Sequence, residues 1–460
     1  MHSVSTVKTN GNYMENLKFY LLTDTHYFEE SLGAEGKAYE EYMKTEAFYL
    51  KESSMINKTV FEKLKADTET EIILIPGDLS KDGEYESHKS LIKELNALKE
   101  AGKKIFVLTA GHDYNEYGRG YKNDEFVKSK GTEFKELYDL YYEFGYNQAL
   151  SVDKETLSYV AEIAPDVRIL AINCDSKNET KGTIDERLLK WAKEQLDKAK
   201  EDKAYTIAMC HYPIIPSVPV FDLVGDAHVK NWREIATFLA DNGVELVLTG
   251  HMHIQSINEF TTQKGNKLCD ICTATTVGTP GKYRKIEITE DGKMNVQSIP
   301  VCDFPIPDEF SSCEEFFDWR FKYSVKNKIN KILEGGSGVV KILKKLGKKV
   351  LNSIKLKTLA RLLFIRIDKS LKNIKLMDFA GEIATAIFKG DMPYIKGTPE
   401  YDAISKVLKR LGFILKKIEP KLSKNGVEVD LTDMILNTIG NNKGYSDNNV
   451  VINLKGNNNL

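Results

Sequence analysis

Long hydrophobic runs are absent from this 460-residue chain. No stretch approaches the roughly 18 consecutive apolar residues that a membrane-spanning helix needs, so no transmembrane segment is predicted. Residues 1–20 also lack the basic segment followed by an apolar one that marks a secretory signal peptide. Unless a leader has been removed, we expect a cytoplasmic protein.

Cysteine and net charge are both scarce. The six cysteines are few for the length, and four lie in or beside apolar, strand-like runs, which favours buried free thiols in a reducing compartment. The Cys-x-x-Cys of "LCDIC" (268–272) has no second pair to complete a zinc site and no thioredoxin-like context, so we interpret it as part of a buried strand. The formal net charge of −2 gives no overall attraction to nucleic acid, and no nucleic-acid partner is expected.

Strands and helices are predicted in alternation up to about residue 300. Short apolar runs predict strands at 18–24, 71–78, 105–108, 167–173, 205–210 and 244–250, followed by a β-rich stretch at 266–301. Apolar residues at helical spacing predict helices at 39–67, 87–104, 185–200 and 231–243. This order is typical of an α/β core, in which functional groups gather just past the carboxyl ends of the strands.

Histidine is rare, yet it is concentrated at those strand ends. Five of the eight histidines directly follow a predicted strand, and aspartates accompany them. The set is Asp24, His26, Asp78, His112, Asp113, His211, His251 and His253. A single Asp-x-His in a loop is most often a capping or solvated pair, but five such sites indicate a shared function.

Aspartate and histidine together form a mixed oxygen and nitrogen ligand set. Neutral imidazole suits Zn, Fe, Mn, Ni and Co, and a carboxylate can bridge two ions. Two divalent ions about 3.5–4 Å apart could clamp a phosphate and activate a water. The absence of cysteine at these strand ends argues against a closed structural zinc site.

The order of the motifs, Asp-x-His, Gly-Asp, Gly-His-Asp, His and Gly-His-x-His, resembles the calcineurin-like metallophosphoesterase superfamily over roughly residues 17–302. The resemblance implies a two-sheet β-sandwich flanked by helices that binds two metal ions (Mn, Fe, Zn or Ni). It implies that Asp24, His26 and His253 hold the first ion, that His211 and His251 hold the second, and that Asp78 bridges them. His112 would donate a proton to the leaving group or stabilise the phosphoryl oxygens, and Asp113 would orient that loop or His112 itself.

The third motif departs from the family pattern. The family has Gly-Asn-His-Asp/Glu, whereas this chain has Ala110-Gly111-His112-Asp113, so the asparagine that binds the second metal is replaced by glycine. We therefore expect a weakened second site, in which water, substrate or a nearby group such as Asn115 fills the gap. If so, the protein should hold closer to one ion than two, and Gly111→Asn should tighten the second site.

The sequence also indicates which branch of the superfamily the chain resembles. Purple acid phosphatases carry a tyrosine three residues after the bridging aspartate, where this chain has Lys81. The stretch "GDLSKDGEYESHKSLIKELNAL" resembles bacterial cyclic-nucleotide phosphodiesterases instead. We expect hydrolysis of a small anionic phosphate ester, most naturally a phosphodiester. The alternatives are a phosphomonoesterase or protein phosphatase with the same site, and a binding protein that kept the fold without the activity.

The composition changes at about residue 303. Residues 322–375 contain sixteen Lys or Arg against two acidic residues, interleaved with apolar residues at helical spacing. We expect residues 303–460 to form a mainly helical C-terminal domain with a solvated basic surface and one short strand in the Asn-rich tail. The basic region could also contact a membrane surface or attract an anionic substrate.

Overall fold

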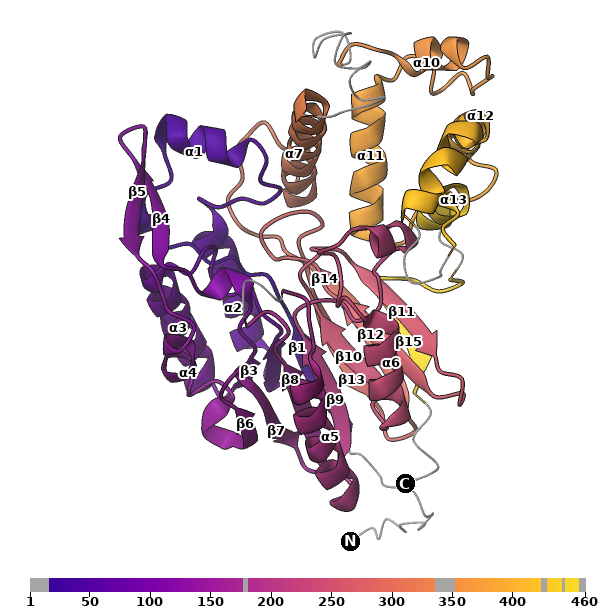
Figure 1. The fold of residues 1–460 in the computed structure, drawn as a ribbon. Coiled ribbons are helices and arrows are strands. Elements are labelled where there is room, and N and C mark those ends of the chain that lie inside the picture. Colours follow the sequence, from indigo (N-terminus) through magenta and orange to yellow (C-terminus); the bar gives the residue numbers. More distant parts are fainter. Residues whose placement is uncertain (1–15, 177–180, 336–351, 423–427, 441–442, 455–460) are drawn as a thin grey trace, which may run out of the picture.

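Two β-sheets packed face to face form the centre of the molecule, with helices outside them and a further group of helices beyond one end (Figure 1). The computed structural model describes residues 16–176, 181–335, 352–422, 428–440 and 443–454. This architecture confirms the predicted α/β sandwich with a helical C-terminal region.

The first sheet has six strands in the order β15-β14-β13-β1-β2-β3. Its strands are β1 (Leu17–Leu21), β2 (Ile72–Ile75), β3 (Lys104–Val107), β13 (Lys282–Ile288), β14 (Lys293–Pro300) and β15 (Asn449–Asn453). The first three strands along the chain run parallel, which brings their carboxyl ends to one edge. The predicted strand of the tail is β15, which pairs with β14, so the end of the chain returns to this sheet.

The second sheet has seven strands in the order β11-β12-β10-β9-β8-β7-β6. Its strands are β6 (Ala149–Asp153), β7 (Ser158–Ala164), β8 (Val167–Ile172), β9 (Tyr205–Cys210), β10 (Leu246–Thr249), β11 (Ser256–Thr261) and β12 (Lys267–Cys272). Strands β8, β9, β10 and β12 are parallel. Both thiols of the Cys-x-x-Cys are buried and free within β12, as expected.

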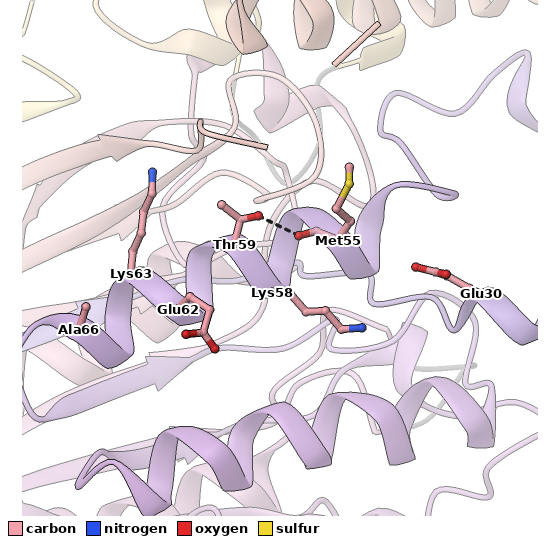
Figure 2. Close-up of a pocket in the computed structure, with 7 residues that line it drawn as sticks. All are labelled: Glu30, Met55, Lys58, Thr59, Glu62, Lys63 and Ala66. Carbon is pink, nitrogen blue, oxygen red and sulfur yellow. Dashed lines mark hydrogen bonds between the residues drawn. The ribbon is translucent and has the colours of Figure 1, made fainter. Parts of the chain in front are cut away.

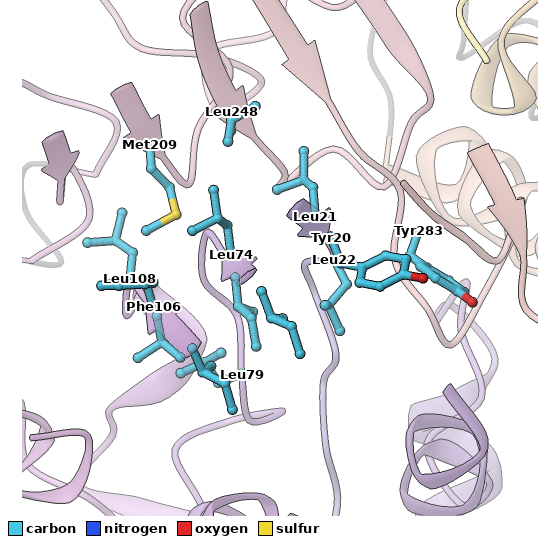
Figure 3. Close-up of a cluster of buried hydrophobic side chains, with 14 of the residues drawn as sticks. Tyr20, Leu21, Leu22, Leu74, Leu79, Phe106, Leu108, Met209, Leu248 and Tyr283 are labelled. Atoms are coloured by element: carbon cyan, nitrogen blue, oxygen red, sulfur yellow. The ribbon is translucent and has the colours of Figure 1, made fainter. Parts of the chain in front are cut away.

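The main hydrophobic core lies between the two sheets. Leu74 of β2 and Phe106 of β3 are fully buried with Met209 of β9 and Leu248 of β10 (Figure 3). A second cluster covers the outer face of the seven-stranded sheet, where α5 (Glu186–Glu201) and α6 (Trp232–Asp241) pack. The strands are therefore apolar on both faces, which explains why they appear in the sequence as continuous apolar runs rather than alternating ones.

The helix expected over 39–67 is interrupted. The structure has α1 (Gly36–Met43) and α2 (Ser53–Ala66), and residues 44–52 between them are not helical. The segment contains Phe48, Tyr49 and Leu50, which are all buried against other parts of the molecule. Tertiary packing thus overrides the local helix preference of this segment.

The remaining helices before residue 303 and a small hairpin complete the part of the molecule around the two sheets. They are α3 (Tyr85–Glu100), α4 (Glu136–Leu140) and the two-stranded sheet of β4 (Tyr117–Lys122) and β5 (Glu125–Lys130). The hairpin and the pair β6 and β7 were not predicted from the sequence. The hairpin strands and β6 are partly exposed, so no continuous apolar run marks them.

The C-terminal region is helical, with α7 (Cys313–Gly335), α10 (Leu356–Leu362), α11 (Leu376–Lys389), α12 (Pro399–Leu422) and α13 (Leu431–Gly440). The most basic stretch, 339–350, lies outside the described residues. Among the helices that are described, none combines the length and apolar character needed to cross a bilayer.

Candidate metal centre

The loops that follow β1 and β2 run side by side and carry the first aspartates. Backbone hydrogen bonds continue past the strand ends, from Asp24 N to Gly77 O and from His26 N to Asp78 O (3.1 Å each). A third backbone bond joins Gly250 N to His211 O (2.9 Å) and links the loops after β9 and β10 in the other sheet. The parallel strands therefore deliver the predicted ligands to one place.

The structure gathers the six predicted metal ligands into two groups of three. Asp24, His26 and His253 form one group, and Asp78, His211 and His251 form the other, with the ligand atoms of each group within 4.8 Å of one another. These are the sets that the sequence motifs predict for the first and second ions. The groups adjoin, since His211 Nε2 of the second lies 4.0 Å from Asp24 Oδ1 of the first.

Within the first group, the nitrogen and oxygen atoms converge on a small volume. His253 Nε2 lies 3.1 Å from Asp24 Oδ1 and 3.0 Å from His26 Nε2. The other carboxylate oxygen of Asp24 accepts hydrogen bonds from Thr23 Oγ1 (2.8 Å) and His251 N (3.0 Å). One oxygen is therefore held in place while the other faces the histidines.

The second group is oriented by backbone carbonyls. His211 Nδ1 donates to Pro76 O (2.9 Å), which leaves Nε2 facing Asp78 Oδ2 at 3.0 Å. His251 Nε2 donates to Asp226 O (2.7 Å), which leaves Nδ1 for coordination. A hydrogen bond from the second ring nitrogen to a carbonyl is the usual way in which a metal-binding histidine is fixed.

Unpaired buried atoms show that these residues fit metal ions. Asp24 Oδ1, His26 Nδ1 and His211 Nε2 are buried without a hydrogen-bond partner among the described residues. Burial opposes protonation of His211, yet Asp78 and Asp24 raise its pKa to about 10. The carboxylate charge that causes this shift is the charge that a bound cation would balance.

The site is held in strained backbone. Five of the six candidate ligands have positive φ, between 38° and 66°: Asp24, His26, Asp78, His251 and His253. Such conformations are costly for residues other than glycine and cluster at functional sites. The glycine of Gly-His-x-His is required by close approach, because a Cβ on Gly250 would lie 2.4 Å from Asp24 Oδ2.

His112 lies beside the first group. Its ring centroid is 5.1 Å from that of His26, and its side chain is 41% exposed. Nδ1 donates to Lys81 O (2.5 Å) and lies 3.2 Å from Asp82 Oδ1, so Nε2 is the nitrogen free for other contacts. Burial and Lys81 lower the pKa of His112, but the carboxylates of Asp78 and Asp82 outweigh them and raise it above the usual value.

The side chain of Asp113 joins two loops. Its carboxylate accepts hydrogen bonds from Ser80 N and Ala110 N (2.8 Å each). The carbonyl of Asp113 is held by His88 Nε2 (2.8 Å), whose Nδ1 contacts Tyr141 Oη (2.6 Å). Asp113 and His88 therefore position the loop that carries His112.

The space left by the missing asparagine is filled by a residue that the sequence analysis did not select. Asp175 Oδ2 accepts a hydrogen bond from Gly111 N at 2.7 Å, and a Cβ on Gly111 would lie only 2.3 Å from that oxygen. Asn115, one of the groups expected to fill the gap, has its Oδ1 bonded to Glu116 N (2.9 Å). The sequence did contain a signal for Asp175, because this residue follows the fourth predicted strand just as the other candidates follow their strands.

An aromatic residue covers the first group. The Phe48 ring stacks on His26, with centroids 4.8 Å apart, and lies 6.1 Å from His253. Its loop is held by α7, since Tyr49 stacks on Phe316 at 3.7 Å and Arg320 Nε donates to Glu46 O at 3.1 Å. The C-terminal region thus supports one wall of the site.

A hollow elsewhere on the surface does not involve these ligands. It measures about 660 Å³ and runs along α2, lined by Glu30, Met55, Lys58, Thr59, Glu62, Lys63 and Ala66 (Figure 2). Its walls are an exposed helix face, and none of the predicted ligands lines it. The converging buried ligands, rather than this hollow, define the candidate site.

Comparison with known proteins agrees with the site. The profile of the calcineurin-like phosphoesterase family matches residues 17–255. The chain therefore belongs to the calcineurin-like phosphoesterases, which confirms the resemblance drawn from the motifs. A search of curated protein sequences finds no match.

Solved structures with related folds include a dimetal phosphatase from Danio rerio, at 13% identity and a TM-score of 0.44, covering 61% of this chain and 95% of that one. A purple acid phosphatase from yellow lupin seeds is 11% identical, with a TM-score of 0.39, over 64% of this chain and 53% of that one. A putative 5′-nucleotidase from Staphylococcus aureus is 14% identical, with a TM-score of 0.38, over 80% of this chain and 72% of that one.

Proposed function

We propose that the protein is a two-metal hydrolase of phosphate esters and that phosphodiesters are its preferred substrates. The observation that supports this most strongly is the pair of adjoining ligand groups, each built from one carboxylate and two histidines. Two ions held there would polarise the phosphoryl oxygens and lower the pKa of a bound water.

The residues of the chain would contribute positioning and proton transfer. Asp78 lies close enough to both groups for its charge to act on His26 as well as on His211, which suits the bridging position. His112 would donate the proton on Nε2 to the leaving oxygen, because Nδ1 is already bound to the carbonyl of Lys81. Asp82 beside Nδ1 favours the protonated form that this step requires.

The preference for diesters rests on the sequence after Asp78, which resembles the cyclic-nucleotide phosphodiesterase branch. Lys81, in the position of the purple acid phosphatase tyrosine, is buried and paired with Asp82 at 3.2 Å. No phenol occupies this position to serve as a metal ligand. The competing functions are a phosphomonoesterase with the same ligands and a binding protein without turnover.

Hydrolysis of two nitrophenyl substrates separates these functions. Metal-depleted protein would be reloaded with Mn²⁺ and assayed with bis-p-nitrophenyl phosphate and with p-nitrophenyl phosphate. We expect a higher kcat/KM for the diester. A higher value for the monoester would favour the phosphomonoesterase, and metal binding without turnover of either would favour the binding protein.

We also propose that the basic C-terminal helices contact an anionic membrane surface. Phe364 and Phe413 are 86% and 73% exposed, and cations lie over both rings, Arg410 at 6.0 Å and Lys417 at 4.1 Å. Exposed apolar side chains ringed by basic ones are the pattern of a surface that rests on anionic lipid.

A further inference from the structure

The residue most in need of an explanation is Asp175. It lies just past β8, its side chain is buried, and its neighbours include Gly111 and the ammonium group of Lys181. A buried carboxylate is costly unless it is paired or binds a cation. Only one of the two oxygens of Asp175 is accounted for, through the hydrogen bond from Gly111 N.

The second oxygen has no partner. Asp175 Oδ1 is buried and accepts no hydrogen bond from any described residue. The backbone on both sides is fixed, because Asp175 N donates to Asn173 Oδ1 (2.9 Å) and Tyr114 Oη donates to Asp175 O (3.2 Å). The carboxylate is therefore held in place with one oxygen left over.

Hydrogen bonds from adjacent backbone N–H groups place the Asp175 carboxylate near the second ligand group: Gly111 N donates to Asp175 Oδ2 (2.7 Å), and His112 N donates to Asp78 Oδ1 (3.2 Å). Asp175 Oδ2 also occupies the space that a side chain at position 111 would need. The carboxylate of Asp175 belongs to a different loop, but it lies where the side chain of the family's asparagine would start.

We propose that Asp175 replaces the family asparagine as the oxygen ligand of the second metal. The glycine at position 111 and the buried carboxylate then depend on each other, because a side chain at position 111 would collide with the carboxylate of Asp175. An anionic ligand in place of a neutral amide also binds a divalent cation more strongly. The second site is therefore complete rather than weakened, which revises the expectation drawn from Gly111 alone.

The proposal predicts a specific pattern of Mn²⁺ binding, measured by calorimetric titration of metal-depleted protein. Wild type should bind two ions per chain. Asp175→Ala should keep the first ion and weaken the second by roughly 10–100-fold or more, the range seen when even indirect metal contacts are lost. Asp153→Ala, which removes a half-buried carboxylate paired with Arg187 at the end of β6, should bind as wild type does.

A second pair of variants separates coordination from loop support. Gly111→Asn alone should weaken the second ion, because the new side chain collides with Asp175 Oδ2. Gly111→Asn combined with Asp175→Ala should recover the second ion relative to Asp175→Ala, because the amide then has both the space and the coordination vacancy. The backbone of Gly111 does not have positive φ, so the asparagine adds no left-handed strain.

Three results would overturn the proposal: tight binding of two ions by Asp175→Ala, a single ion bound by wild type, or no recovery in the double variant. The last would show that Asp175 only supports the loop. The inference rests on the proposed two-metal site, but its readout is metal binding. A single ion bound by wild type would also contradict the proposed two-metal site, whereas the other two results concern Asp175 alone and leave that site standing. The proposed activity is measured separately, by turnover.

Discussion

His112 is the residue on which proton transfer depends in this account. His112→Ala should lower kcat for substrates with poor leaving groups by about 10²–10⁴-fold, the usual effect of losing a general acid. The loss should shrink for nitrophenyl esters, whose leaving group needs no proton. Metal content, measured by mass spectrometry, should stay at the wild-type level because His112 belongs to neither ligand group.

Loss of an ion in His112→Ala would refute this role and make His112 a ligand. An equal loss of turnover for good and poor leaving groups would refute proton donation and leave stabilisation of the phosphoryl oxygens. His88→Gln serves as a control for the loop, since His88 holds the carbonyl of Asp113 without contacting the reacting region.

The candidate functional residues could be predicted from the sequence where they belong to a motif of the family. The six candidate metal ligands could be selected because each follows a strand, and parallel strands bring their ends together. Asp175 was missed although it has the same position after a strand, because the motifs of the family contain no such residue. Its role depends on the contact with Gly111, which is 64 positions away and visible only in three dimensions.

Helix α7 is the element that connects the C-terminal region with the metal centre. Its Arg320 is buried and donates to the carbonyls of Met43 and Glu46, in the segment that carries Phe48 onto His26. Arg320→Leu would leave these buried carbonyls without a hydrogen-bond donor, which should lower the free energy of unfolding by about 1–3 kcal/mol. We expect a lower free energy of unfolding by urea denaturation and a raised KM, because the wall of the site loosens.

Lys322→Leu is the matched control on the same helix. Lys322 forms a 2.7 Å ion pair with the half-exposed Glu382, and pairs of this kind contribute less than about 1 kcal/mol. The two variants should therefore differ in both stability and KM. If they behave alike, α7 does not support the Phe48 loop.

Strands could be predicted from the sequence where nearly every residue along the strand is buried. Strands β1, β2, β8, β9 and β10 are buried on both faces, so their apolar runs stand out in the sequence. The break between α1 and α2 was not predictable, because it exists to place Phe48 over His26 and Tyr49 against Phe316. Those partners are distant in sequence, and local propensity carries no information about them.

At the scale of the whole molecule, the C-terminal helices should direct the protein to anionic lipid. The protein should bind phosphatidylcholine vesicles containing phosphatidylserine more tightly than pure phosphatidylcholine vesicles, in a sedimentation assay. Replacing Phe364 and Phe413 by Ser should weaken that binding by about tenfold or more, because two apolar side chains no longer leave water.

Leu150→Ser is the control for this experiment, since Leu150 is 57% exposed but lies on β6, in the other part of the molecule. Equal binding to both kinds of vesicle, or an equal effect of Leu150→Ser, would rule out a lipid-binding role for the basic helices. The aromatic residues would then be free to serve a protein partner.

The central claim is that two metal ions, joined through Asp78, carry out phosphate ester hydrolysis. The most direct test is turnover of bis-p-nitrophenyl phosphate by metal-depleted protein as Mn²⁺ is added, with Asp78→Ala assayed in parallel. Asp78 would be the carboxylate shared by both ions, so activity should appear only as the second equivalent binds, and Asp78→Ala should stay inactive at every Mn²⁺ concentration. Full activity after one equivalent, or near wild-type turnover in Asp78→Ala, would contradict the account.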